Sequence, residues 1–258
     1  VFVLEPSNDH RSMRNDPMKI LVLNAGSSSQ KSCLYEFKGG AIPSPSAPLW
    51  EAEIEWTHRQ VSAKLRVTTA QGALLEEKLK AESPAEATGH LLRTLWSGPT
   101  KVIGESSAID IVGHRVVHGG LEYEQSTFVT PKVKEAIARL SELAPAHNPA
   151  SLEGIEGVEQ ILGAVPQVAV VDTAFHAQMP EMAAVYPGPY EWLQQGMRRY
   201  GFHGISHQYC AARAAEILDR NLKDLRLVTC HLVTVVRWRR FAAAAASTPQ
   251  WGLRHWMG

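Results

Sequence analysis

The chain has 258 residues, of which 45% are hydrophobic, enough to bury the core of one large domain or two smaller ones. Its 26 Lys and Arg residues balance its 26 Asp and Glu residues, so no overall field attracts it to nucleic acid or to a membrane surface. Cys33, Cys210 and Cys230 are far apart and in no metal-binding spacing, which favours reduced thiols in a cytoplasmic protein. Residues 1–17 lack the features of a signal peptide and are expected to be an unstructured extension.

The first half of the chain predicts a sheet followed by a helix. Strand patterns at residues 20–23 and 32–37 flank a loop of small residues, which is typical of a hairpin. Residues 49–56 and 63–69 are further strand candidates. From Pro84 the apolar residues recur at helical spacing, and proline suits the first turn of a helix.

The second half alternates strands with helices, which indicates an α/β fold. We expect strands at residues 109–112, 168–171 and 225–230, and helices at residues 129–143, 149–162 and 207–218. Four polar residues lie at or just after the carboxyl ends of predicted strands, where open α/β sheets bind ligands. They are Asn24, Arg115, Asp172 and His231.

The stretch MKILVLNAGSSSQK, residues 18–31, ends an apolar run in a cluster of small polar residues. An ordinary hairpin turn explains this composition, because Asn, Gly and Ser are common turn residues. A loop that holds an anion, with the charge of Lys31 beside it, is the alternative, although the spacing alone favours the turn. The spacing matches neither the Walker nor the dinucleotide-binding glycine pattern, so the local sequence leaves both interpretations open.

Two further residues have a functional and a structural interpretation. Arg115 lies between glycine-bearing flanks in GHRVVHGG, where its guanidinium could bind a carboxylate or phosphate, or could pair with a surface carboxylate. Asp172 follows a buried strand, where it could orient hydrated Mg²⁺, accept a proton or cap the next segment.

The stretch RRYGFHGISHQY holds two histidines, His203 and His207, at the spacing of helical metal ligands. Gly204 between them weakens the helix that such a site requires, so we favour a histidine that donates to a charged oxygen. His147 in LAPAHNPAS precedes a helix, where it could cap the helix or line a pocket.

Taken in order, these stretches resemble one family, the acetate kinases of the acetokinase group, within the actin-like ATPase superfamily. The stretches are LVLNAGSSSQK, GHRVVHGG, LAPAHNPASLEGI, DTAFHAQMP, YGFHGISH and LVTCHL, and the resemblance covers residues 18–232. It implies an α/β fold of the actin-like, ribonuclease H-like type. Residues 18–224 would be the N-terminal domain, and residues 225–232 the first strand of a mostly missing C-terminal domain.

The resemblance also implies a reaction and a role for each matching residue. The reaction is reversible in-line transfer of the γ-phosphoryl group of MgATP to acetate, which gives acetyl phosphate and ADP. The implied roles are Asn24 near the metal, Ser27, Ser29, Lys31 and His231 around the phosphates, Arg115 on acetate and the moving phosphoryl group, Val117 in the methyl pocket, Asp172 as the acidic catalytic residue and His203 as a stabiliser of the transition state.

One departure from the family bears on substrate choice. The family reads Leu-Ala-Pro-Leu-His-Asn-Pro where this chain has Ala146 in place of the second leucine, beside the implied acyl pocket. A smaller side chain could admit propionate or butyrate, although one methylene discriminates by only about 1–3 kcal/mol. A non-catalytic module that binds a carboxylate or phosphate through Arg115 is the alternative outside the enzyme class.

The resemblance breaks after Leu232, where the family continues with Gly-Asn-Gly and this chain reads Val-Thr-Val. Deleting one base from GGT AAC GGT G gives GTA ACG GTG, which encodes Val-Thr-Val. Moving the codons of ASTPQWGLRHWMG back by one base permits SVDTTMGLTPLDG, which again resembles acetate kinase. Residues 233–258 are therefore predicted to be an out-of-frame tail.

The tail has no acid and no lysine, but several arginines and tryptophans, which is also typical of a nucleic-acid or membrane patch. We favour the frameshift because it explains the same residues. The resemblance implies that a second catalytic arginine is missing with the C-terminal domain, and such a loss costs on the order of 10³ or more in rate. The chain as written is expected to be inactive, and the homodimer common in the family is in question for it.

Overall fold

The computed structural model describes residues 17–26, 29–38, 47–56, 62–80 and 83–232, and the backbone of residues 237–242 and 245–251. The chain divides into two compact units, one of residues 1–116 and 126–170 and the other of residues 117–125 and 171–258. Both strands and helices are present, as the predicted α/β class requires. The predicted boundary between residues 224 and 225 stays a prediction.

The first unit is built on a sheet with the strand order β5-β4-β3-β2-β1-β6-β8-β7. β1 to β5 form an antiparallel meander, and β6 returns to pair with β1 in parallel. The strands are β1 (Met18–Ala25), β2 (Ser29–Phe37), β3 (Trp50–Trp56), β4 (Ala63–Thr69), β5 (Leu74–Leu79), β6 (Ile111–Val116), β7 (Thr127–Phe128) and β8 (Gln167–Val171).

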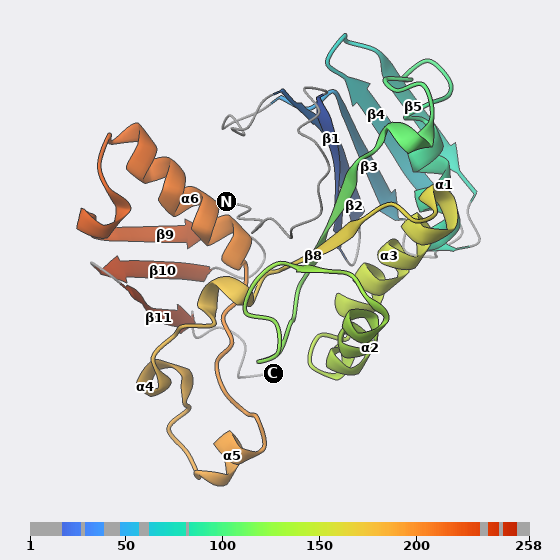
Figure 1. Ribbon diagram of the computed structural model, residues 1–258. Coiled ribbons are helices and arrows are strands. Elements are labelled where there is room, and N and C mark those ends of the chain that lie inside the picture. Colours follow the sequence, from blue (N-terminus) through green and yellow to red (C-terminus); the bar gives the residue numbers. More distant parts are fainter. Residues whose placement is uncertain are drawn as a thin grey trace, which may run out of the picture. The chain divides into compact units, whose positions relative to one another are not determined.

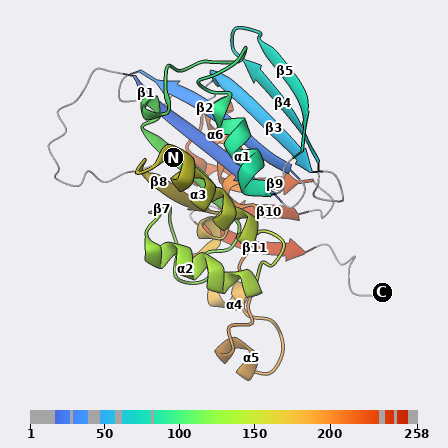
Figure 2. The same ribbon diagram turned by 90° about the vertical axis from the view of Figure 1, so that its right-hand side faces the viewer.

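One face of this sheet is apolar and covered by helices. Alternate residues of β1 to β4 point to that face, and they form a buried cluster with side chains from α1 (Pro84–Arg93) and α3 (Asn148–Leu162). Both helices lie along the sheet in Figure 2, and α2 (Pro131–Arg139) packs on α3. The other face of β2 to β5 carries mostly charged side chains, so the sheet has one apolar side and one polar side.

The second unit contains α6 (Gly204–Ile217), which packs along β9 (Leu227–His231), as Figure 1 shows. β9 pairs with β10 (Arg237–Ala242), and β10 pairs with β11 (Ala245–Trp251), both in antiparallel fashion. The remaining short elements are α4 (Glu181–Ala184) and α5 (Glu191–Gln194) with η3 (Ala174–His176) and η4 (Leu222–Asp224) here, and η1 (Ser106–Ala108) and η2 (Leu140–Glu142) in the first unit. In the part of the chain that the structure describes, no helix is long and apolar enough to cross a membrane.

The predicted elements are present, with shifted ends. The strand expected at residues 109–112 runs instead from Ile111 to Val116 and so includes Arg115. The helix expected at residues 129–143 ends at Arg139 and continues as a 3₁₀ turn. The helix expected at residues 207–218 begins earlier, at Gly204. His203 precedes it in the left-handed region, so His203 and His207 do not form a helical i, i+4 pair, which agrees with the expectation drawn from Gly204.

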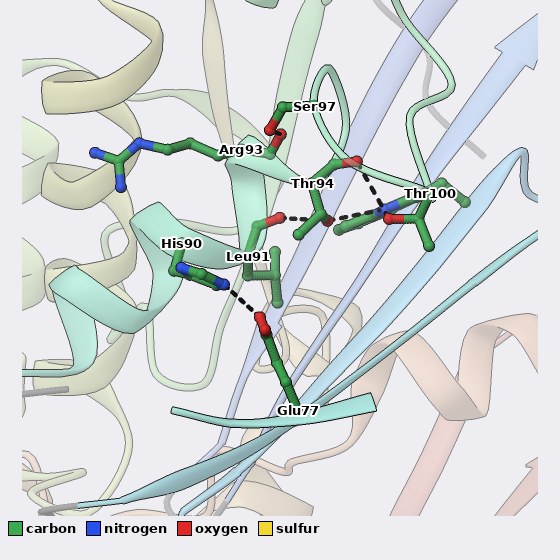
Figure 3. Close-up of polar contacts among 8 residues, drawn as sticks. Glu77, His90, Leu91, Arg93, Thr94, Ser97 and Thr100 are labelled. Carbon is green, nitrogen blue, oxygen red and sulfur yellow. Dashed lines mark hydrogen bonds and ion pairs between the residues drawn. The ribbon is translucent and has the colours of Figure 1, made fainter. Parts of the chain in front are cut away.

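The end of α1 is tied to the sheet through Trp50, which is fully buried. Thr94 Oγ1 accepts a hydrogen bond from the Trp50 indole nitrogen at 3.2 Å. The same hydroxyl donates to the Leu91 carbonyl at 2.7 Å, and Figure 3 labels both Thr94 and Leu91. Ser97 Oγ donates to the Arg93 carbonyl at 2.7 Å in the same turn, where the Ser97 side chain is exposed (Figure 3). Thr94 therefore satisfies a donor that has no access to water.

Replacement of Thr94 by valine should destabilise the first unit by about 1–3 kcal/mol, because it leaves the buried Trp50 N–H without its acceptor. Ser97→Ala is the matched control, since it removes only a surface hydroxyl and should cost less than about 0.5 kcal/mol. Urea unfolding followed by circular dichroism measures both. Equal losses in the two variants would contradict the role given to Thr94.

Candidate active site

Hydrogen bonds of Gly26, Ser29 and Gln30 fix the chain on both sides of the turn between β1 and β2. The Gly26 N–H donates to the Ser29 carbonyl at 2.8 Å. Gln30 points to the buried face, where its Oε1 accepts a hydrogen bond from Thr88 of α1 at 3.0 Å. Because side chains alternate along a strand, this anchor turns Ser29 and Lys31 to the polar face. Ser27, which was predicted to contact phosphate, lies outside the described residues.

Arg115 lies beside Asn24 across the parallel pair of β6 and β1. Its Nη1 donates to Asn24 Oδ1 at 3.2 Å, although the two residues are 91 positions apart in sequence. The Arg115 carbonyl accepts from Ser151 Oγ of α3 at 3.2 Å, which fixes the backbone of β6 at this point. The sequence prediction placed both residues near strand ends, and the structure brings their side chains together.

Lys31 lies on the other side of Asn24, because it is the residue opposite Asn24 in the β1–β2 register. Its Nζ is 3.3 Å from Glu53 Oε1 of β3. Two cations, from Arg115 and Lys31, thus flank one exposed amide on the polar face of the sheet. Such an arrangement suits a phosphate or carboxylate.

In the second unit, a backbone hydrogen bond brings Asp172 close to the residue that follows His203. Asp172 directly follows β8 and is buried, and its carbonyl accepts the Gly204 N–H at 3.1 Å. His203, with φ of 55°, occupies the left-handed region just before α6. A Cβ at Gly204 would lie 2.1 Å from the Asp172 carbonyl oxygen, so only glycine permits this contact.

His203 and His231 are stacked, with ring centroids 4.3 Å apart and an angle of 11° between the planes. His231 Nδ1 is 2.9 Å from Ser206 Oγ of α6, and His207 Nδ1 is 2.7 Å from Thr229 Oγ1 of β9. Ser206 and Thr229 did not stand out in the sequence. The only signal for Ser206 is its position one turn into the helix that His203 precedes.

The two residues predicted for the acyl pocket lie in different units. Val117 is buried in the second unit, and Ala146 is exposed in the turn before α3 in the first. The predicted site residues therefore form two local groups. Asn24, Ser29, Lys31 and Arg115 share the polar face of the first unit, and Asp172, His203 and His231 belong to the second.

The histidines next to Arg115 and Val117 are held neutral. Burial lowers the pKa of His114 from 6.5 to about 4, although hydrogen bonding to Gln167, 2.6 Å away, and the charge of Glu159 oppose the shift. Burial also lowers the pKa of His118, whose Nδ1 accepts the Gly120 N–H at 3.0 Å. The His114 ring therefore adds no charge to the strand that carries Arg115 at neutral pH.

A possible metal ligand is Asn24, which was predicted to lie near the metal. Among the residues that the structure describes, no group of three or more His, Cys, Asp or Glu side chains could hold a metal ion. The exposed Asn24 amide oxygen retains a second lone pair beside the bond from Arg115. That donor fits an ion such as Mg²⁺ that keeps most of its waters and is carried by substrate phosphates.

A sequence model of the acetokinase family matches residues 19–235. The chain belongs to the acetokinase family. It is 62% identical over 215 residues to an acetate kinase of Cyanothece sp. and 60% identical over 216 residues to one of Nostoc sp., in each case 83% of this chain and 53% of the relative. It thus spans about half the length of these curated relatives.

Two solved structures of kinases are similar to this chain over most of its length. The crystal structure of Porphyromonas gingivalis acetate kinase superposes with a TM-score of 0.80 at 34% identity, over 91% of this chain and 57% of that one. A propionate kinase from Francisella tularensis superposes with a TM-score of 0.77 at 32% identity, over 92% of this chain and 58% of that one. The predicted fold class, an actin-like N-terminal domain within the acetokinase family, is confirmed.

The low pKa of His114 makes the stability of the chain dependent on pH. Between 6.5 and about 4 the unfolded chain binds a proton that the folded chain does not, so the free energy of unfolding falls as the pH falls through this window. The shift corresponds to about 3 kcal/mol at the acid end. Urea unfolding at several pH values should show a weaker acid dependence for His114→Gln than for the unaltered chain. Parallel pH profiles would contradict this.

Gly204→Ala should destabilise the second unit by about 3 kcal/mol or more, because the new Cβ would overlap the Asp172 carbonyl, which is backbone and cannot rotate away. Gly154→Ala in α3 is the control: a Cβ there meets no atom within 4 Å, and alanine should stabilise a helix by roughly 0.5–1 kcal/mol. Thermal unfolding distinguishes the two. A neutral Gly204→Ala would mean that the contact does not hold Asp172.

Proposed function

We propose that the residues of this chain belong to an acetate kinase, which transfers the γ-phosphoryl group of ATP reversibly to acetate and yields acetyl phosphate and ADP. The observation that carries the proposal is the contact of Arg115 with Asn24 beside Lys31, where Asn24 and Lys31 lie on the strands that flank the loop expected to bind phosphate. The identity of 62% to an acetate kinase of Cyanothece sp. supports acetate as the substrate.

The proposed chemistry relies on positioning and charge. In phosphoryl transfer, charge spreads over the equatorial oxygens, and catalysis comes from groups held in place around them. Arg115 offers a fork of N–H donors to the carboxylate of acetate and to the moving phosphoryl group, while Ser29 and Lys31 bind ATP phosphates. Mg²⁺, when bound with ATP near Asn24, supplies neutralisation of phosphate charge.

The residues of the second unit are proposed to act on the same reaction. Asp172 is the acidic catalytic residue, His203 donates to the transferring group, and His231 contacts phosphate. The stacked rings of His203 and His231 and the contact of Ser206 with His231 support this assignment, because they fix the direction of both imidazoles. Val117 and Ala146 are proposed to line the acyl pocket, and the small Ala146 keeps propionate as the alternative substrate.

We further propose that residues 233–258 are read in a shifted frame. The family match ends at residue 235, three residues after Leu232, which supports this. The free thiols of Cys33, Cys210 and Cys230 support a cytoplasmic location. We propose a homodimer only for a full-length protein of this family, and not for the 258-residue chain.

The test is an assay of acetyl phosphate formation from acetate and MgATP, with the 258-residue chain and a version in which the reading frame is restored after Leu232. The restored protein should be active and the 258-residue chain should not. Arg115→Ala in the restored protein should lower the rate by about 10³-fold or more. Arg93→Ala, a surface arginine at the end of α1, is the control and should change the rate less than twofold.

Each other outcome counts against a stated part of the proposal. Equal activity of the two versions would refute the frameshift, and an active Arg115→Ala variant would refute the role of Arg115. Faster turnover of propionate than of acetate would select the alternative substrate. If the restored protein binds acetate by calorimetry and forms no acetyl phosphate, the non-catalytic binding module replaces the kinase.

A further inference from the structure

A row of polar side chains crosses the open face of the sheet from the candidate anion site to its edge. The residues occupy registered positions on six neighbouring strands, β6-β1-β2-β3-β4-β5. In order they are Arg115, Asn24, Lys31, Glu53, Arg66 and Glu76. The inner end of the row carries two cations, and carboxylates enter only from β3 outward. Neighbouring strands are about 4.8 Å apart, so each charge acts on the next.

Lys31 stands between two possible partners in this row. On one side is Asn24 with its bond to Arg115, and on the other is Glu53. The structure places the ammonium 3.3 Å from the Glu53 carboxylate. The side chains of Lys31 and Glu53 are 63% and 36% exposed, and ion pairs with that much water around them contribute little to stability. The pair is therefore easily exchanged for another anion.

We infer that Glu53 is a positioning residue that holds Lys31 away from the anion site until phosphate binds, and that binding moves Lys31 from Glu53 to the phosphate. The inference rests on the proposed function, since it concerns the lysine assigned to ATP. A phosphate over Asn24 offers Lys31 more negative charge than one carboxylate does. The exchange brings Lys31 closer to Arg115, and the bound phosphate offsets the repulsion between the two cations because it contacts both.

Two features of the same face permit the exchange. Arg66 lies opposite Glu53 in the β3–β4 register, although its Nε is 3.5 Å from Glu76 Oε1, so a cation remains on the neighbouring strand when Lys31 leaves Glu53. A cavity of about 350 Å³ also opens on this face, and Lys31, Glu53, Arg66 and Thr68 are among the residues that line it. The cavity lies over β2 to β4, so the Lys31 side chain borders open space and is not packed in one direction.

The first half of the test needs no ligand. NMR relaxation of the Lys31 Cε group in the 258-residue chain reports how firmly the side chain is held, and Glu53→Gln should lower its order parameter. Glu55→Gln is the matched control, because Glu55 is on the same face of β3, is exposed and lies opposite Ser29 at the loop rather than opposite Lys31. It should leave Lys31 unchanged. An unaltered Lys31 in Glu53→Gln would overturn the inference.

The second half measures binding of MgATP by calorimetry. Glu53→Gln should tighten binding by roughly 2–5-fold at low salt, because the competitor of the phosphate is gone, and the gain should vanish at high salt. Glu55→Gln should change the dissociation constant less than twofold. In a Lys31→Gln background, Glu53→Gln should give no gain, since there is no lysine to release. A gain that persists in that background would show simple repulsion of phosphate by Glu53 and would overturn the exchange.

Failure of the proposed function looks different from failure of this inference. If no variant binds MgATP while Lys31 responds to Glu53→Gln as stated, the positioning by Glu53 is supported and the assignment of the nucleotide site falls. If MgATP binds equally to all variants and Lys31 does not respond, the nucleotide site stands and the positioning falls.

Discussion

The candidate anion site of the first unit depends on one constraint, the parallel register of β1 and β6. That register places Leu23 opposite His114, and the next residues of the two strands are Asn24 and Arg115, whose side chains meet on the polar face. A slip of one residue would turn Arg115 to the helix-covered side, because side chains alternate along a strand. The neighbouring His114 already points there, and it is buried against Gln167.

The apolar face holds this register in place. The buried cluster of β1 to β4 with α1 and α3 is made of side chains that leave the core if a strand shifts, and burial of each large apolar side chain is worth roughly 1.5–3 kcal/mol. Polar anchors add direction: Thr88 holds Gln30 at the start of β2, and Ser151 holds the backbone of Arg115. The side chains of the anion site are thus placed by contacts on the opposite side of the sheet.

Some elements of this structure can be predicted from the sequence, and others cannot. Periodicity predicts most strands and the long helices, and strand ends locate Asn24 and Arg115, because these signals are local. β5, with the sequence LLEEKL, is missed since an edge strand carries charges on its open face, and α4 and α5 are too short for helical periodicity. The ion pair of Lys31 with Glu53 depends on the β2–β3 register. The sequence does not give that register, because a long connection separates the two strands. The need for Gly204 arises from Asp172, 32 positions earlier.

The contacts that hold the scaffold are stronger than the contacts at the candidate anion site. Contacts that fix the fold are buried, such as Trp50 with Thr94, and breaking them leaves a polar group without a partner. Contacts at the anion site are exposed and weak, as the ion pair of Lys31 with Glu53 is. A binding site needs weak contacts of this kind, because a ligand must replace them and replacing a weak contact costs little free energy. The buried His114, whose pKa is lowered by burial, follows the same rule: it supports the strand that carries Arg115 without adding a charge to that strand at neutral pH.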